Sequence, residues 1–290
     1  MLLKKFLLGL FSLILLIPPF SQAQKKPVSS LLWRISGKGL KQPSYIFGTF
    51  HIMCKSDFRI SPSLEAKIKT AKQFYGELDM DDPGMQMNLM AKMRLQETSL
   101  SKLLGDDDYK TVSDSFKSIT GMPLQLFNQF SPFMPMSLLA INSIKCTDRI
   151  QPETEFVTIA KNNQLPVLGL ESIEDQINAI NAQPLDSQAL AFKQTVLNYD
   201  SVQQVMQKMI QVYKENDTEK IYRFIKDNGG TNDFETAMLV TRNKNWIPVI
   251  KKAVAAKPSF FAVGAGHLGG KQGVIALLKK EGYTLTPVLY

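Results

Sequence analysis

The sequence predicts an α/β protein with a mixed central sheet that is flanked by helices and interrupted by a large helical insert. Strand-like apolar runs alternate with helical segments at both ends of the 290-residue chain. The chain closes on the strand SFFAVGA, a helix and the strand YTLTPVLY, which is typical of a sheet with helices on its faces. Residues 82–150 contain no convincing strand, and they define the insert.

The first 23 residues have the three parts of a cleavable secretory signal. Lys4 and Lys5 provide the charged region, an apolar run of about 12 residues follows, and small residues at Ser21 and Ala23 precede the expected cleavage point. The alternative is an uncleaved anchor, but a bilayer-spanning helix needs about 20 apolar residues. We expect an exported protein, periplasmic or secreted, with no membrane span after cleavage and one domain over residues 24–290.

After this lead-in, the N-terminal part reads strand, strand, helix, strand. Runs at 32–35 and 44–47 are separated by the turn-rich GKGLKQP, which predicts an antiparallel hairpin. Ser61 as N-cap with Pro62 at the first helical position begins a helix, and a third strand follows at 73–78. The hairpin and the third strand are therefore expected to belong to the central sheet.

The middle of the chain is mostly helical. The insert at 82–150 is rich in methionine, which is read either as adaptable core packing or as a flexible substrate-facing lid. The run LPVLGLE at 165–171 restores a strand. A long helical stretch at 173–257 then has breaks near Pro184, Asp200, Asn216 and the pair Gly229–Gly230.

Charge and cysteine content limit the function. The net charge of +8 is scattered along the chain, whereas nucleic-acid-binding proteins gather Lys and Arg on one face, so a nucleic-acid partner is not favoured. The two cysteines, Cys54 and Cys146, form no CxxC motif. An even number in an oxidising compartment favours a structural disulfide, and two unrelated buried thiols are the alternative.

Both histidines of the chain stand in the same local pattern. Gly48 precedes His51, and Gly264 precedes His267, by three residues after an apolar run. Glycine lets the backbone leave a strand sharply, so each histidine is expected at the carboxyl end of its strand, where ligand crevices form in α/β sheets. In one sheet the two imidazoles would converge, either as metal ligands or as a proton-transfer pair.

Two glutamates follow strand-like runs in the same way. Glu77 ends the run QFYGE and Glu171 ends VLGLE. Each is a potential metal ligand or general base, and the alternative is a helix cap or a solvated carboxylate. Two histidines with a carboxylate and open positions suit Mn, Fe, Co or Zn. Arg242 would clamp a carboxylate, that of Glu77 or of a substrate, or else form a surface ion pair.

The segments LLWRISGKG, PSYIFGTFH, YGELD, LPVLGLES, TRNKNW and FFAVGAGHLGGKQGVIALLKKEGYTLTPV resemble the TraB/GumN family, which includes Tiki-type metalloproteases. The resemblance implies a core related to the erythromycin-esterase and ChaN-like folds and a divalent metal, Mn, Co or Zn. The paired GxxH motifs and the strand-end glutamate of the family fall on His51, His267 and Glu77. The family's arginine–asparagine pair falls on Arg242 and Asn243, and the resemblance places Asn243 next to the metal ligands. Many family members have an acidic residue before this arginine, where the present chain has Thr241.

These observations predict an exported metal-dependent hydrolase that cleaves a peptide or protein through a metal-bound water. Glu77 or Glu171 would act as ligand or general base, and Arg242 would stabilise developing negative charge. The chain has no GxSxG, Walker or HExxH motif. The alternatives are a non-catalytic binder of metal, haem or peptide, and an accessory protein of polysaccharide export or signalling.

Overall fold

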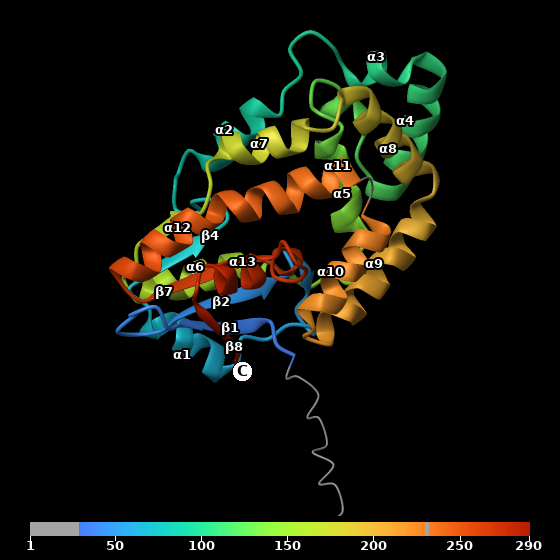
Figure 1. The fold of residues 1–290 in the computed structure, drawn as a ribbon. Coiled ribbons are helices and arrows are strands. Elements are labelled where there is room, and N and C mark those ends of the chain that lie inside the picture. Colours follow the sequence, from blue (N-terminus) through green and yellow to red (C-terminus); the bar gives the residue numbers. More distant parts are fainter. Residues whose placement is uncertain (1–28, 230–231) are drawn as a thin grey trace, which may run out of the picture.

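The computed structural model describes residues 29–229 and 232–290, so the predicted signal segment lies outside the described residues. Its centre is a six-stranded mixed sheet (Figure 1). In spatial order the strands are β6 (Val167–Gly169), β4 (Gln73–Gly76), β7 (Ser259–Gly264), β2 (Ser44–Thr49), β1 (Leu32–Ser36) and β8 (Thr284–Pro287). This sheet with helices around it confirms the predicted fold class.

Four neighbouring strands, β6, β4, β7 and β2, run parallel, so their carboxyl ends lie at one edge of the sheet. The register pairs Thr49 with Gly264 and Gly76 with Gly169, all at the last residues of their strands. On the other side, β1 pairs antiparallel with both β2 and β8. The antiparallel hairpin expected from the sequence is therefore confirmed.

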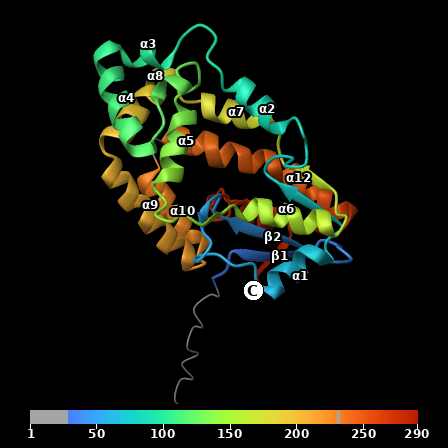
Figure 2. The ribbon, with the colours of Figure 1, turned by 180° about the vertical axis from the view of Figure 1, so that it is seen from behind.

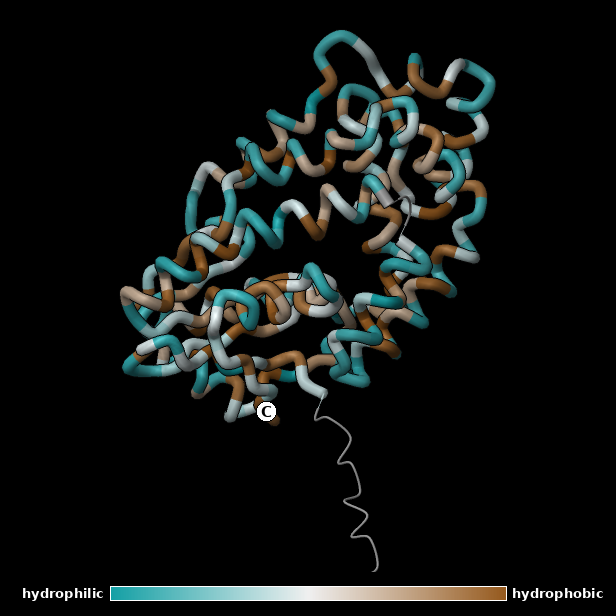
Figure 3. Tube along the Cα trace, in the orientation of Figure 1, coloured by the Kyte–Doolittle hydropathy of each residue, from teal (hydrophilic) through white to brown (hydrophobic). Residues whose placement is uncertain are grey.

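Helices cover both faces of the sheet (Figures 1 and 2). One face packs against α1 (Pro62–Thr70) and α6 (Pro152–Asn162), and the other against α12 (Arg242–Ala256) and α13 (Val274–Lys280). Side chains of the fully buried strand β7 point alternately to the two faces of the sheet. Phe260 therefore belongs to the first core and Phe261 to the second. Hydropathy along the tube shows apolar segments of the sheet in the lower half of the view (Figure 3).

The first helix begins where the sequence predicts. The Ser61 hydroxyl accepts a hydrogen bond from the Leu64 N–H, and Pro62 occupies the first helical turn, where its missing N–H costs nothing. Leu64 and Ile68 of this helix are buried against the sheet.

A helical lobe stands beside the sheet (Figure 1). It contains α2 (Met85–Lys92), α3 (Leu100–Leu104), α4 (Asp106–Thr120), η1 (Leu124–Phe127), α5 (Phe133–Asn142), α7 (Ile173–Asn181), α8 (Leu185–Leu197), α9 (Tyr199–Lys214), α10 (Thr218–Asn228), α11 (Asn232–Glu235) and the π-helix η2 (Thr236–Thr241). Phe116 of α4 and Leu139 of α5 share a core with Phe192 of α8. Helices from before and after β6 thus pack as one unit.

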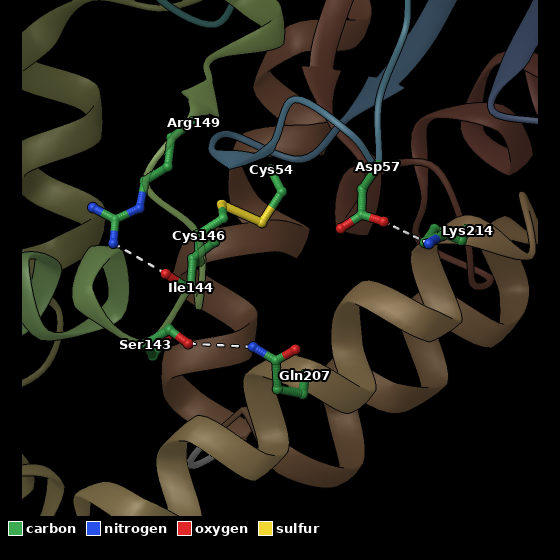
Figure 4. The surroundings of a disulfide bond; sticks show 8 residues. All are labelled: Cys54, Asp57, Ser143, Ile144, Cys146, Arg149, Gln207 and Lys214. Atoms are coloured by element: carbon green, nitrogen blue, oxygen red, sulfur yellow. Dashed lines mark hydrogen bonds and ion pairs between the residues drawn. A yellow bond between two sulfur atoms is a disulfide. The ribbon is translucent and has the colours of Figure 1, made fainter.

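The two cysteines are joined, with 5.9 Å between their Cα atoms (Figure 4). Cys54 lies in the short strand β3 (Met53–Cys54), which pairs antiparallel with β5 (Arg149–Ile150). Because Cys146 follows α5 directly, the bond ties the end of α5 to the segment that leaves β2. The predicted disulfide is confirmed, whereas β5 is a strand that the sequence did not indicate.

Within the described parts of the chain, no helix combines the length and the apolar character needed to cross a membrane.

Candidate functional site

The residues singled out in the sequence meet at the carboxyl edge of the parallel strands. His51 lies two residues beyond β2, Glu77 directly follows β4, and Glu171 lies two residues beyond β6. His267 ends η3 (Ala265–His267), the 3₁₀ turn that follows β7. The parallel register brings these strand ends together although more than 200 positions separate the two histidines.

His267 is buried and held in one orientation. Asn243 donates through Nδ2 to the carbonyl oxygen of Gln272, so its Oδ1 faces His267 Nδ1 at 2.7 Å and accepts the ring N–H. The Nε2 atom then carries the lone pair, and Arg242 Nη1 lies 3.2 Å from it. Burial lowers the pKa of His267 to about 3, so the ring is neutral at ordinary pH.

Glu77 is held as a carboxylate between the backbone and a guanidinium. Its Oε1 accepts from the Gly264 N–H at 2.7 Å, and its Oε2 accepts from Arg242 Nη2 at 2.6 Å. Burial alone would raise the pKa of Glu77, but the cationic groups around it hold that pKa well below its usual range. Since His267 is neutral, we ascribe this effect chiefly to Arg242. His267 Nε2 lies 3.8 Å from Glu77 Oε1.

Arg242 uses all of its donors inside the protein. Nε and Nη2 bind Glu171, Nη2 also binds Glu77, and Nη1 faces the Met238 carbonyl and His267. The side chain is 6% exposed, so the surface-ion-pair alternative is wrong and the buried clamp is correct. With five N–H groups engaged, the guanidinium positions other side chains and has no donor left for a substrate.

Glu171 has a different place from the one the sequence suggested. Its oxygens accept from Arg242 and from Trp246 Nε1, the latter at 2.9 Å, and its side chain is 3% exposed. Burial raises its pKa, while Arg242 opposes that rise. Both oxygens face α12 instead of the cavity beside the histidines. Glu171 thus contacts Arg242 and Trp246 and does not line the cavity, and its predicted role as ligand or general base stays a prediction.

Glu153 is a member of the site that sequence reasoning missed. It lies in the first turn of α6, and its Oε1 accepts from His51 Nδ1 at 2.7 Å and from the Thr49 hydroxyl at 2.5 Å. Desolvation lowers the pKa of His51, but the hydrogen bond and charge of Glu153 outweigh it and raise that pKa to about 9. In sequence Glu153 reads as an ordinary acidic residue at a helix N-terminus, and no local signal links it to His51.

The two motif glycines are required by close packing. A Cβ atom on Gly264 would lie 3.2 Å from His51 Nε2 and 3.3 Å from Glu77 Oε1, so it would fill the space between them. A Cβ on Gly48 would lie 2.8 Å from a Leu268 methyl carbon. Neither glycine has a positive φ. A backbone conformation reserved for glycine is therefore not required here, and the close approach of neighbouring groups accounts for both glycines.

His51 and His267 line one cavity of about 480 Å³, together with Arg242, Gly264 and residues of α5, α9, α10 and η2. In Figure 1, β2 runs toward α9 and α10, which stand beyond the strand ends. The sheet edge supplies the polar side of this cavity, and the helices supply the other walls.

The donors match a divalent ion in kind. Each imidazole is held through Nδ1 by an oxygen acceptor, Glu153 for His51 and Asn243 for His267, as is usual for metal-ligating histidines. Glu77 adds an ionised carboxylate. In residues 29–229 and 232–290, however, no three His, Cys, Asp or Glu side chains close around a point where an ion would sit. Arg242 instead contacts both His267 and Glu77.

The fold and the site define an α/β protein with a histidine–carboxylate–arginine cluster at the carboxyl edge of a parallel sheet. The profile of the TraB/PrgY/gumN family matches residues 31–287, so the chain belongs to this family and the resemblance seen in the motifs is confirmed.

Curated relatives of the chain carry the name of a protease. The chain is 23% identical over 321 residues to Metalloprotease TIKI2 of Danio rerio, and this alignment covers 91% of the chain and 61% of the relative. It is 24% identical over 317 residues to Metalloprotease TIKI1 of Homo sapiens, with 90% and 62% covered. The chain thus spans about three fifths of the length of these relatives. No solved structure matches it significantly.

Proposed function

We propose that this protein is an exported metal-dependent hydrolase that cleaves peptide bonds. The observation that carries the proposal is that His51 and His267 line one cavity, with each imidazole held from behind through Nδ1 and with Glu77 next to both of them. The distant metalloprotease relatives support the reaction class, and the signal-like N-terminal sequence supports export to the periplasm or medium.

His51 Nε2, Glu77 and His267 Nε2 would hold the ion. A bound Mn, Co or Zn ion supplies chemistry that these side chains lack, because it lowers the pKa of water toward neutrality. The chain's own groups have supporting roles. Glu153 and Asn243 fix the two imidazoles so that Nε2 faces the cavity. Arg242 keeps Glu77 ionised, and Glu171 and Trp246 keep Arg242 in place.

A chelation and reconstitution experiment tests this function. The protein is stripped with EDTA and assayed on an internally quenched peptide library before and after addition of Mn²⁺, Co²⁺ or Zn²⁺. We expect hydrolysis only after one of the ions is restored, and loss of at least about a hundredfold in His51→Ala and His267→Ala, since removal of a ligand removes the activated water.

The folded state of each variant is checked by thermal unfolding, and Lys244→Ala on the exposed side of α12 is the matched control. Equal hydrolysis by the stripped protein, or full activity in the double histidine variant, would contradict the proposal. Stoichiometric metal or haem binding without turnover would favour the non-catalytic binder instead.

A further inference from the structure

Apart from its polar edge and the uncharged side chains of Ser137 and Gln151, the cavity at the histidines is apolar. Its far walls come from α5, α9, α10 and η2. The side chains that face the sheet edge from these walls are Ile141, Ile144, Met206, Met209, Ile225 and Met238. At about 480 Å³ the cavity has the size of an ordinary small-ligand pocket and exceeds what a single bound ion and a water would need.

The cavity offers no charge to a polar ligand beyond the cluster itself. No lysine, aspartate or glutamate occurs among the described residues that line it. The Arg242 charge is matched by Glu77 and Glu171, and its donors are all engaged. A charged group against Met206 or Ile141 would lose its hydration without a partner, which is costly, whereas an apolar group there is favoured.

We propose that this apolar wall is the specificity pocket of the enzyme and that it selects peptides with a large apolar side chain next to the cleaved bond. The inference rests on the proposed function and names its substrate class. An amide placed at His51 and His267 puts a flanking side chain against the helices, because α5, α9, α10 and η2 supply most of the other residues that line the cavity. Met206, Met209 and Met238 are adaptable, so Leu, Met and Phe are all accepted.

The experiment scans one position of an internally quenched peptide, adjacent to its cleavage point, over Leu, Met, Phe, Asp and Lys. We expect kcat/KM for the three apolar residues to exceed that for Asp and Lys at least tenfold, because a hydrophobic pocket discriminates even one methylene by about tenfold or more. Met206→Glu removes the preference for Leu and admits Lys. The control is Val205→Glu, at the neighbouring position of α9, which is 36% exposed and lies outside the cavity lining.

Binding separates this inference from the proposed function. Fluorescently labelled Leu and Asp peptides are titrated by polarisation against the His51→Ala/His267→Ala variant. Selective binding of the Leu peptide without hydrolysis by wild type supports the pocket and overturns the hydrolase. Hydrolysis by wild type with no preference for apolar residues supports the hydrolase and overturns the pocket. A third outcome would overturn the inference in favour of a lipid site. In that outcome the Leu peptide binds no more tightly than the Asp peptide, and a fatty acid displaces it.

Should Met206→Glu unfold, Met206→Ala gives the same test. The enlarged wall is expected to shift the preference from Leu toward Phe by several-fold, and an unchanged Leu-to-Phe ratio would contradict the pocket.

Discussion

Arg242 lies against His267, with 3.2 Å between Nη1 and Nε2, and the same guanidinium binds Glu77 and Glu171. A single buried cation therefore ties together residues that follow three different strands. Because it pairs with two buried carboxylates, the site and the stability of the domain depend on the same side chain.

Replacing Arg242 should destabilise the whole domain. Arg242→Ala leaves the buried Glu77 and Glu171 unpaired, and breaking such a pair costs about 3–5 kcal/mol of unfolding free energy. Arg242→Lys keeps the positive charge but lacks the planar set of N–H donors of a guanidinium, so we expect an intermediate loss of unfolding free energy. Urea unfolding measures both. Lys244→Ala, on the same helix but exposed, should stay within about 0.5 kcal/mol of wild type; an equally small change in Arg242→Ala would show that the buried pairing contributes nothing.

Removing Glu153 should weaken the site without unfolding the protein. Glu153→Ala frees the His51 ring, and loss of such a supporting partner typically lowers metal affinity or activity about 10–100-fold. Glu153→Gln keeps an acceptor for Nδ1 and should recover part of that loss. The measurement is Co²⁺ affinity by absorption together with peptide turnover. Glu155→Ala is the control, since Glu155 is an exposed acid in the same first turn of α6. A similar effect in both alanine variants would point to the helix dipole instead of His51.

The motif glycines should respond differently to an added methyl group. Gly264→Ala places Cβ between His51 and Glu77, so we expect metal binding and turnover to fall while unfolding changes little. Gly48→Ala pushes against Leu268 in the core, so it should lower stability by about 1–3 kcal/mol, as overpacking does. Thermal unfolding and Co²⁺ titration of the two variants test this contrast, and the opposite pattern would show that the packing argument is incorrect.

The disulfide should stabilise the domain and hold one wall of the cavity. Cys54 and Cys146 are 92 positions apart, for which the chain-entropy model gives about 4–5 kcal/mol less any strain. Reduction, or the Cys54→Ser/Cys146→Ser variant, should lower the unfolding free energy by up to that amount. It should also loosen Ile141, in the last turn of α5, and Ile144, just beyond that helix, which both line the cavity. Unchanged stability under reducing conditions would mean that the bond is not formed.

The two histidines should give the metal-free protein a stability maximum near pH 6.5. The pKa of His267 falls to about 3 on folding, so the unfolded state binds more protons below pH 6.5 and stability drops toward acid by up to about 1.4 kcal/mol per pH unit. The pKa of His51 rises to about 9, so its contribution is complete below pH 6.5 and is lost as pH increases to 9. This second slope should be weaker because His51 is 66% exposed.

Urea unfolding in EDTA between pH 5 and 9 measures both slopes. His267→Gln should flatten the acid side only, and His51→Gln the alkaline side only. A profile that is unaffected by either variant would exclude these groups as the source of the pH dependence.

The sequence by itself determined the strands of the central sheet, the hairpin and the strand-end positions of His51, Glu77 and His267. Apolar periodicity, Ser61–Pro62 capping and the glycine-x-x-histidine spacing are local properties, so they can be predicted from neighbouring residues. The parallel order of the strands then fixed the shared edge. What the tertiary structure alone decided is how each polar group is paired.

Glu153 reaches His51 only because α6 packs against the end of β2, and Glu171 faces Arg242 only because α12 crosses that edge of the sheet. The apolar wall of the cavity likewise comes from α5 and α9, which the chain brings to the histidines from segments far away in sequence. Hydrogen-bond partners and cavity walls depend on contacts between distant segments, and these contacts are set by the packing of the whole core.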